Sequence, residues 1–112
     1  MNLLHSDLLT SPEAGPADAG SRRLAARFAA LSHPARIEIL QHLASHDCCC
    51  CGDVVRKLDL AQSTVSQHLR VLVDAGLVTF EPDRQRSRYR IDRDALSGLS
   101  DQVANLINSC CR

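Results

Sequence analysis

Apolar residues recur every three or four positions in five stretches of the chain, which is the spacing that gives a helix one apolar face. In the fourth of these stretches, for example, Val65, Leu69 and Leu72 share a face. Two shorter stretches alternate apolar with polar residues, as half-buried strands do. The pattern predicts helices over 21–32, 34–46, 52–59, 62–76 and 93–111, with strands over 77–83 and 87–92.

The remaining apolar positions are expected to lie on the inward faces of these elements. They are Leu24, Phe28, Leu31, Ile37, Leu40, Leu43, Val54, Val55, Leu58, Val73, Val78, Phe80, Tyr89, Ile91, Leu96, Leu99, Val103, Leu106 and Ile107. Polar residues and glycine mark the helix ends. Ser32 and Asp92 are suited to cap the second and last helices because their side chains can accept a backbone N–H, and Gly76 is suited to end the fourth.

Composition limits the size of the folded part. Residues 1–20 mix Pro, Gly, Ala and Asp without a sustained period, so we expect a flexible arm there and a folded domain over 21–112. Roughly 90 residues are close to the lower limit for a stable domain, which favours a dimer. Aromatic residues are scarce, so the core consists of aliphatic residues that favour helices. The expected fold is mainly α with a two-stranded β unit, in the order α-α-α-α-β-β-α.

The charge balance leaves the kind of partner open. The 13 basic and 13 acidic residues give a formal net charge of zero, which argues neither for nor against nucleic acid. No apolar run is long enough to span a bilayer, and the N-terminus lacks the segments of a signal peptide, so we expect a cytoplasmic protein with no membrane partner. Without a nucleophile–base pairing or a phosphate-binding glycine loop, the sequence argues against an enzyme.

Two helices joined by a short turn, at 52–58 and 62–72, have the order of a helix-turn-helix, in which the second helix enters the major groove of DNA. That second helix is called the reader helix below. Its polar face and the arginines between the two strands together predict an interface with double-stranded DNA, although each feature alone is common on solvated surfaces. The predicted contacts are Gln62, Ser63, Thr64, Ser66, Gln67, Arg70, Arg84, Arg86 and Arg88, with Arg90 beside them.

The stretches LSHPARIEILQHL, LDLAQSTVSQHLRVLVDAGLV and SRYRID resemble the arsenic-repressor family, also called the ArsR/SmtB family, over residues 24–108. The resemblance implies a winged helix-turn-helix whose two strands form the wing. It also implies a homodimer held by its first and last helices, and a repressor that leaves its operator when an inducer binds. A thiol-rich metal buffer is the alternative from another class, and it would need neither the reader helix nor the arginines.

All six cysteines lie in two groups, and we predict each of them as a thiolate ligand: Cys48, Cys49, Cys50, Cys51, Cys110 and Cys111. Cysteine often only fills space in a core, but four in a row cannot all be buried, because successive helical residues point about 100° apart. The run of four precedes the third helix, and a helix N-terminus favours the thiolate that binds soft ions and reacts with oxidants. His68 has no other ligand near it in sequence, so we expect a packing role.

The resemblance also allows the ligand patterns to be compared. The first cysteine of the family pattern CVCDLC falls on Cys50, but the second and third fall on Gly52 and Val55. Zinc sites on the last helix need histidines after the wing, and this chain has none there. The expected inducer is a trivalent arsenical, held by Cys110, Cys111 and one cysteine of 48–51 from the same or the partner chain. Cadmium, lead or zinc ions, or a thiol redox or reactive-sulfur signal without a cofactor, are the alternatives.

Overall fold

The computed structural model describes residues 16–46, 49–84 and 87–111 of the chain. Within these ranges the elements are α2 (Pro16–Leu31), α3 (Pro34–Ala44), β1 (Cys49–Cys50), α4 (Cys51–Leu58), α5 (Gln62–Asp74), β2 (Val78–Glu81), β3 (Arg88–Ile91) and α6 (Arg93–Cys110). The predicted order is confirmed, with β1 as an addition. None of the helices in the described ranges has the length and apolar character that crossing a bilayer requires. The predicted site residues Cys48 and Arg86 lie outside the described residues.

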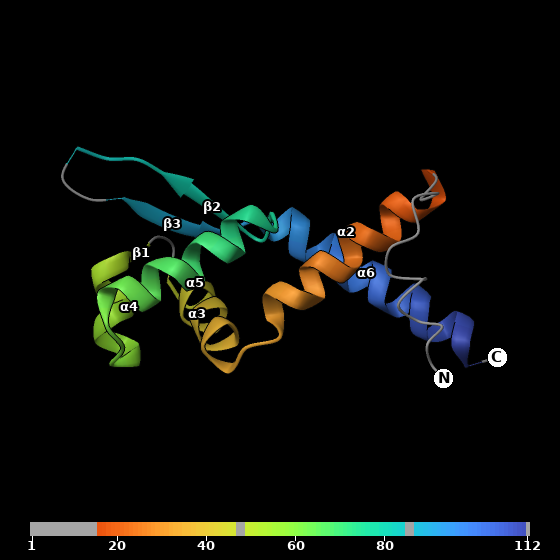
Figure 1. Cartoon of the computed structure of the whole chain (residues 1–112), viewed down its shortest axis with the longest axis horizontal. Coiled ribbons are helices and arrows are strands. Elements are labelled where there is room, and N and C mark those ends of the chain that lie inside the picture. Colours follow the sequence, from red (N-terminus) through yellow and green to blue (C-terminus); the bar gives the residue numbers. More distant parts are fainter. Residues whose placement is uncertain (1–15, 47–48, 85–86, 112) are drawn as a thin grey trace, which may run out of the picture.

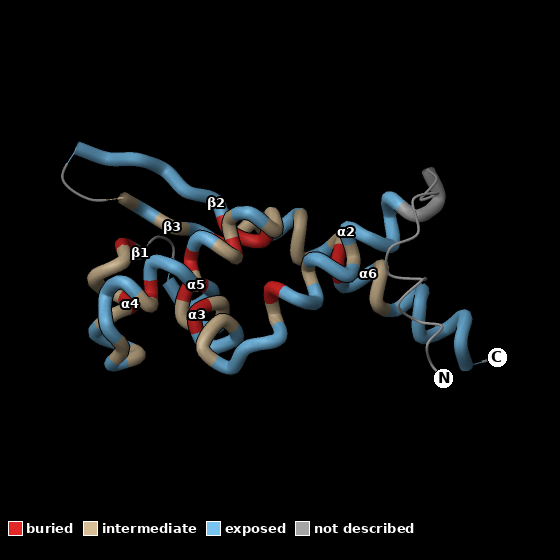
Figure 2. Tube along the Cα trace, in the orientation of Figure 1, coloured by how far each residue is buried: buried red, intermediate tan, exposed pale blue. Residues whose placement is uncertain are grey.

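The elements form two regions (Figure 1). Helices α3, α4 and α5 and the sheet cluster at one end of the molecule, and α2 and α6 cross each other and extend toward the other end. The molecule measures 49 × 29 × 23 Å along its principal axes. Its radius of gyration of 16.7 Å exceeds the roughly 13 Å expected of a compact chain of this length. This extended shape leaves much of α2 and α6 uncovered, as Figure 2 shows.

The core lies where the cluster of helices meets the sheet. The most deeply buried side chains are Ile39, Leu43, Val54, Val65, Leu69, Leu72 and Leu77. The apolar face predicted for the reader helix α5 is therefore confirmed. The face predicted for α3 was wrong at Ile37, which is 45% exposed, because steps of three residues fall 60° short of a full turn. Ile39 occupies the core instead, four residues from Leu43 and on the same face.

The ends of the helices follow the predicted capping chemistry at two of three positions. Asp92 caps α6 by accepting the N–H of Ala95 at 3.0 Å, and Gly76 follows α5 with a φ of +80°. Ser32 does not cap α3, because its hydroxyl donates to the Ala29 carbonyl at 2.8 Å in the last turn of α2. His33 takes this role, and its Nδ1 accepts the N–H of Ala35 at 3.1 Å.

Helix α2 begins at Pro16, so the helix includes residues 16–20 of the predicted arm. Proline is compatible with the first turn of a helix, where its missing N–H has no intrahelical partner to lose. The helical part of the chain therefore starts before residue 21.

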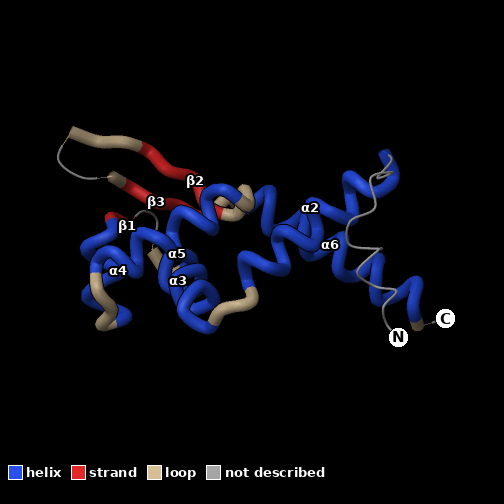
Figure 3. The backbone as a smooth tube through the Cα atoms, viewed as in Figure 1, coloured by secondary structure: helices blue, strands red, loops and turns tan. Residues whose placement is uncertain are grey.

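The sheet has three strands in the order β1-β3-β2, all antiparallel (Figure 3). The predicted pair is present, with Val78 opposite Ile91 and Phe80 opposite Tyr89. Strand β1 was not predicted, because two adjacent cysteines carry no alternation of apolar and polar residues. It pairs Cys49 with Tyr89 and Cys50 with Arg88, which attaches these two cysteines to the first two residues of β3.

Replacing the cap of the longest helix tests the local stability of α6. We expect Asp92→Ala to lower the free energy of unfolding by about 1 kcal/mol, because the N–H of Ala95 loses its acceptor. Urea denaturation followed by circular dichroism measures this difference. Asp94→Ala is the matched control, since Asp94 lies in the same first turn without being the cap residue. Equal losses in the two variants would contradict a specific capping role for Asp92.

Candidate DNA interface and cysteine groups

Helices α4 and α5 form the predicted helix-turn-helix. The turn between them begins at Asp59, whose left-handed backbone (φ 57°, ψ 43°) ends α4. Val54 of α4 and Val65 and Leu69 of α5 are completely buried in the common core. This packing fixes which side of α5 faces the protein and which side faces solvent.

The solvent side of α5 carries the predicted contacts of the reader helix. Gln62, Ser63, Ser66, Gln67 and Arg70 are exposed, and Thr64 is half-buried. They are short hydrogen-bonding groups with one guanidinium, which are suited to base edges and phosphates. The structure therefore presents these side chains together on one open surface.

The wing consists of β2, β3 and the residues between them. Arg84, Arg88 and Arg90 are exposed. Arg88 pairs with Asp83 at 3.3 Å between Nε and Oδ2, but both side chains are open to solvent, so this ion pair contributes little to stability. Arg88 and Arg90 lie on the opposite face of β3 from Tyr89, because side chains alternate along a strand. The predicted arginine face is thus present for the described residues of β3.

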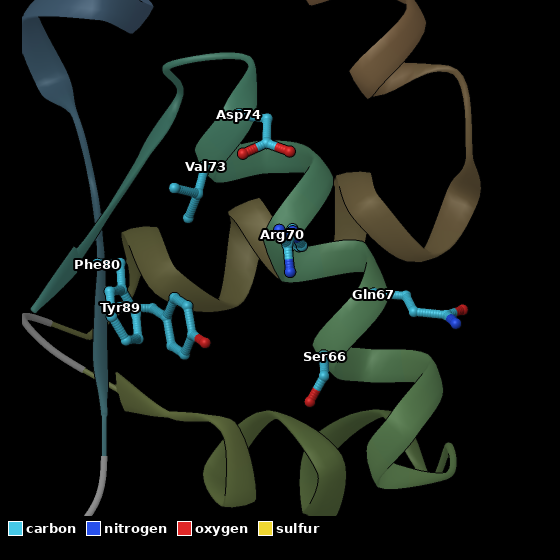
Figure 4. Close-up of a pocket in the computed structure, with 7 residues that line it drawn as sticks. All are labelled: Ser66, Gln67, Arg70, Val73, Asp74, Phe80 and Tyr89. Atoms are coloured by element: carbon cyan, nitrogen blue, oxygen red, sulfur yellow. The ribbon is translucent and has the colours of Figure 1, made fainter. Parts of the chain in front are cut away.

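A cleft of about 490 Å³ separates α5 from the wing (Figure 4). Its walls come from α5 on one side and from β2 and β3 on the other, where the rings of Phe80 and Tyr89 lie with centroids 5.3 Å apart. Phe80 is 46% exposed although the alternation in β2 predicted it on the inward face. This cleft cannot be predicted from the sequence, because the strand pattern alone does not show that α5 stops short of covering Phe80.

His68 connects the reader helix to the start of α3. Its Nδ1 accepts a hydrogen bond from Arg36 Nε at 3.2 Å, and its ring lies 4.4 Å from that of His33. Arg36 also donates to the Ala29 and Ala30 carbonyls at 3.3 Å, so it joins the end of α2 to α5. Burial, together with the charges of His33 and Arg36, lowers the pKa of His68. These contacts agree with the predicted packing role.

The lowered pKa of His68 predicts a dependence of stability on pH. Unfolded His68 takes up a proton near pH 6.5 and folded His68 only at lower pH. The free energy of unfolding is therefore expected to fall as the pH drops below 6.5, and this loss ends below the folded-state pKa. His68→Asn keeps an acceptor for Arg36 without a titrating group, so its stability should depend less on pH. Urea denaturation of both proteins over a pH series measures this. Equal slopes would contradict the role of His68.

Cys50 and Cys51 lie where α4, the sheet and α5 meet. The Cys50 side chain is buried and its Sγ lies 3.3 Å from Oδ2 of Asp53, which also accepts the Cys50 N–H at 3.1 Å. The Cys51 side chain is half-buried and its Sγ lies 3.5 Å from Oγ of Ser66 on the reader helix. Burial, and secondarily the nearby Cys51, raise the pKa of Tyr89. Cys50 thus caps α4, whereas Cys51 contacts the predicted DNA surface.

The second cysteine group is remote from the first within one chain. Cys110 ends α6 and Cys111 follows it, and both are exposed. Figure 1 places this end of α6 at the opposite end of the long axis from β1 and α4. Among the described residues, no three His, Cys, Asp or Glu side chains gather to hold an ion. Within this one chain, Cys110 and Cys111 lie far from Cys50 and Cys51, because the 18-residue α6 carries its last turn away from β1 and α4.

The packed helix pair, the exposed reader face and the adjoining basic wing define a winged helix-turn-helix protein of the DNA-binding class. Residues 31–79 match the profile of a helix-turn-helix domain. The chain is 34% identical over 93 residues to the HTH-type transcriptional regulator YgaV of Escherichia coli K12, which covers 83% of this chain and 91% of that protein. It is 32% identical over 78 residues to the arsenical resistance operon repressor of Bacillus subtilis, which covers 70% of this chain and 74% of that protein.

A solved structure extends this similarity to the whole fold. The homodimeric winged helix-turn-helix DNA-binding domain of a possible ArsR-family regulator from Mycobacterium bovis superposes with a TM-score of 0.69 at 25% identity. The match covers 86% of this chain and 91% of that domain. The chain belongs to the ArsR/SmtB family of transcriptional repressors.

Proposed function

We propose that this repressor binds double-stranded operator DNA as a homodimer, through α5 and the wing, and is released by a thiol-reactive inducer. The first candidate for the inducer is a trivalent arsenical, bound by cysteine thiolates. In this proposal the protein acts in the cytoplasm, together with the DNA that it regulates. Cys48, Cys49, Cys50, Cys51, Cys110 and Cys111 are the candidate ligands.

The contact between Cys51 and Ser66 carries the proposal for induction. The Cys51 Sγ lies 3.5 Å from a hydroxyl on the exposed face of the reader helix. A group bound to this sulfur therefore has to displace Ser66 or shift α4 against α5. Two reader helices of a dimer have to match about one turn of DNA, roughly 34 Å, so a small shift of α5 lowers the affinity for the operator.

Among the described residues of one chain, no three thiols gather at one place, as an arsenical bound by three thiolates requires. Cys50 and Cys51 both lie beside oxygen atoms, of Asp53 and Ser66 respectively. We infer that the exposed pair Cys110 and Cys111 of a second protomer supplies the other thiolates. A soft divalent ion would need three or four thiolates in the same place, whereas a redox or reactive-sulfur signal would need only two.

Fluorescence anisotropy with a labelled duplex from upstream of the protein's own coding sequence tests the function. We expect tight binding of the parent, and release by arsenite or a monosubstituted arsenical without any oxidant. Release by peroxide or polysulfide that dithiothreitol reverses, without a response to arsenicals, would replace the arsenical by a redox signal. Release only by cadmium, lead or zinc would make the protein a metal sensor. Failure to bind DNA in any of these conditions would favour a metal buffer.

The reader helix and the wing should differ in how they affect specificity. Gln67→Ala is expected to weaken operator binding by about 1–3 kcal/mol, because Gln67 is placed to bond a base edge. Arg84→Ala is expected to weaken operator and unrelated DNA equally and to reduce the salt slope by about 1, as the loss of one phosphate contact does. Salt titrations of binding to both duplexes measure these effects. Parent-like binding of both variants would contradict the assignment of this surface to DNA.

A further inference from the structure

The cleft between α5 and the wing lies where one DNA strand has to pass, if the proposed function is correct. The reader helix of a winged helix-turn-helix occupies the major groove, and a wing beside it reaches toward the neighbouring minor groove. The two grooves are separated by a single sugar–phosphate backbone. The space between α5 and the wing therefore faces that backbone.

The chemistry of the cleft fits such a strand. Ser66 and Arg70 of α5 bring a hydroxyl and a guanidinium to it, and Tyr89 of β3 brings a phenol. Gln67 also borders the cleft, but its amide is directed away from the two rings (Figure 4). Serine hydroxyls, amides, phenols and guanidinium groups are all hydrogen-bond donors suited to phosphate oxygens. The cleft and the reader face share Ser66, Gln67 and Arg70, so the cleft is continuous with the proposed DNA surface.

Two of these donors are available to a ligand, because they bond to no other group in the described part of the chain. Neither the Tyr89 hydroxyl nor the Arg70 guanidinium has a hydrogen-bond or ion-pair partner among the described residues, although Asp74 lies one turn from Arg70 on the same wall. Figure 4 shows the Tyr89 hydroxyl directed toward α5 near Ser66 and away from Asp74. A phosphate held at the Ser66 end therefore avoids the carboxylate.

Phe80 adds an apolar surface beside these donors. Its ring is 46% exposed and lies against Tyr89 with an interplanar angle of 52°. A large exposed ring that borders a group of donors is suited to packing on the apolar face of a deoxyribose. We propose that the cleft grips the operator backbone, with Tyr89 and Arg70 on one phosphate and Phe80 on the adjoining sugar. In this proposal Tyr89 and Phe80 contact the DNA backbone directly and fix its position against α5 and the wing.

Tyr89→Phe tests this proposal, because it removes only the hydroxyl and keeps the ring contact with Phe80. We expect operator binding to weaken by about 10-fold, and binding to unrelated DNA to weaken equally, because a hydrogen bond to a charged phosphate is lost. Thr79→Val is the matched control. It removes a hydroxyl that donates to the Arg90 carbonyl at 3.2 Å and does not line the cleft, and it should bind like the parent.

Neutral methylphosphonates placed one at a time along the bound duplex locate the contact. The parent should lose affinity at several phosphates, and Tyr89→Phe should be insensitive at one of these while keeping the parent's losses at the others. Parent-like binding of Tyr89→Phe, or equal losses for both proteins at every phosphate, would overturn the proposal. These results apply to the cleft alone, since a parent that binds no DNA at all contradicts the proposed function instead.

Discussion

Leu106→Asp is expected to convert the protein into a monomer that no longer holds operator DNA. Leu106 and Ile107 on α6 are 44% and 53% exposed, and Phe28 on α2 is 40% exposed. They lie on the two helices that extend from the cluster of α3, α4, α5 and the sheet, which accounts for the large radius of gyration. A second copy of the chain can cover these side chains, and the Mycobacterium bovis domain with the same fold is a homodimer.

The expected effect of this substitution is large for two reasons. A carboxylate placed in an apolar contact without a partner is costly, because it loses its hydration. Two linked reader helices also gain affinity through their effective concentration, and a monomer gives up about 100-fold or more. Sedimentation equilibrium at micromolar concentration measures the first effect, and anisotropy with the operator duplex measures the second.

Ile37→Asp is the matched control for Leu106→Asp. Ile37 is 45% exposed, so it has almost the same exposure as Leu106, but it lies at the start of α3. We expect this variant to remain a dimer and to keep most of its affinity for DNA. A Leu106→Asp variant that sediments as a dimer, or an Ile37→Asp variant that dissociates equally, would contradict the assignment of the interface to α2 and α6.

The regular parts of the fold could be predicted because their information is local. Val65, Leu69 and Leu72 repeat with the period of a helix, and Asp92 precedes a helix with the side chain that a cap requires. The helix-turn-helix, the wing and the polar face of the reader helix all follow from such patterns. Ile37 differs from this pattern, because a step of three residues follows one face of a helix only over a short length.

The features that could not be predicted depend on contacts between distant parts of the chain. Strand β1 forms because Cys49 and Cys50 pair with β3. Two adjacent cysteines have no sequence property that predicts this pairing. The cap at His33 is a local exception: the Ser32 hydroxyl is bonded to the Ala29 carbonyl, so the neighbouring His33 accepts the N–H of Ala35 instead. The separation of the two cysteine groups follows from the direction of α6. That direction depends on how α6 packs and cannot be predicted from the local pattern of its residues.

The cysteines should separate induction from DNA binding. We expect Cys51→Ser to bind the operator like the parent and to lose the response to a trivalent arsenical almost completely, because a serine hydroxyl is a much weaker ligand for soft trivalent arsenic than a thiolate. Cys48→Ser and Cys49→Ser are the matched controls within the run and should respond nearly like the parent. The operator should in turn weaken arsenical binding, since coupling between two sites is reciprocal. A variant without any cysteine at 48–51 that still responds would contradict the role of the run.

Mixing two inactive variants tests whether the site joins two chains. The double variant Cys110→Ser, Cys111→Ser is expected to bind DNA and fail to respond, as Cys51→Ser does. A mixed dimer of these two variants contains one complete site if Cys51 of one protomer meets Cys110 and Cys111 of the other, and none if each site lies within one chain.

The geometry of a single chain places the two cysteine groups at opposite ends of the molecule. We therefore expect each mixed dimer to regain one of its two arsenical sites, so that a random mixture, in which about half of the dimers are mixed, binds about a quarter of the arsenical that the parent binds and regains part of the release from DNA. A mixed dimer that stays unresponsive would exclude a site shared between protomers.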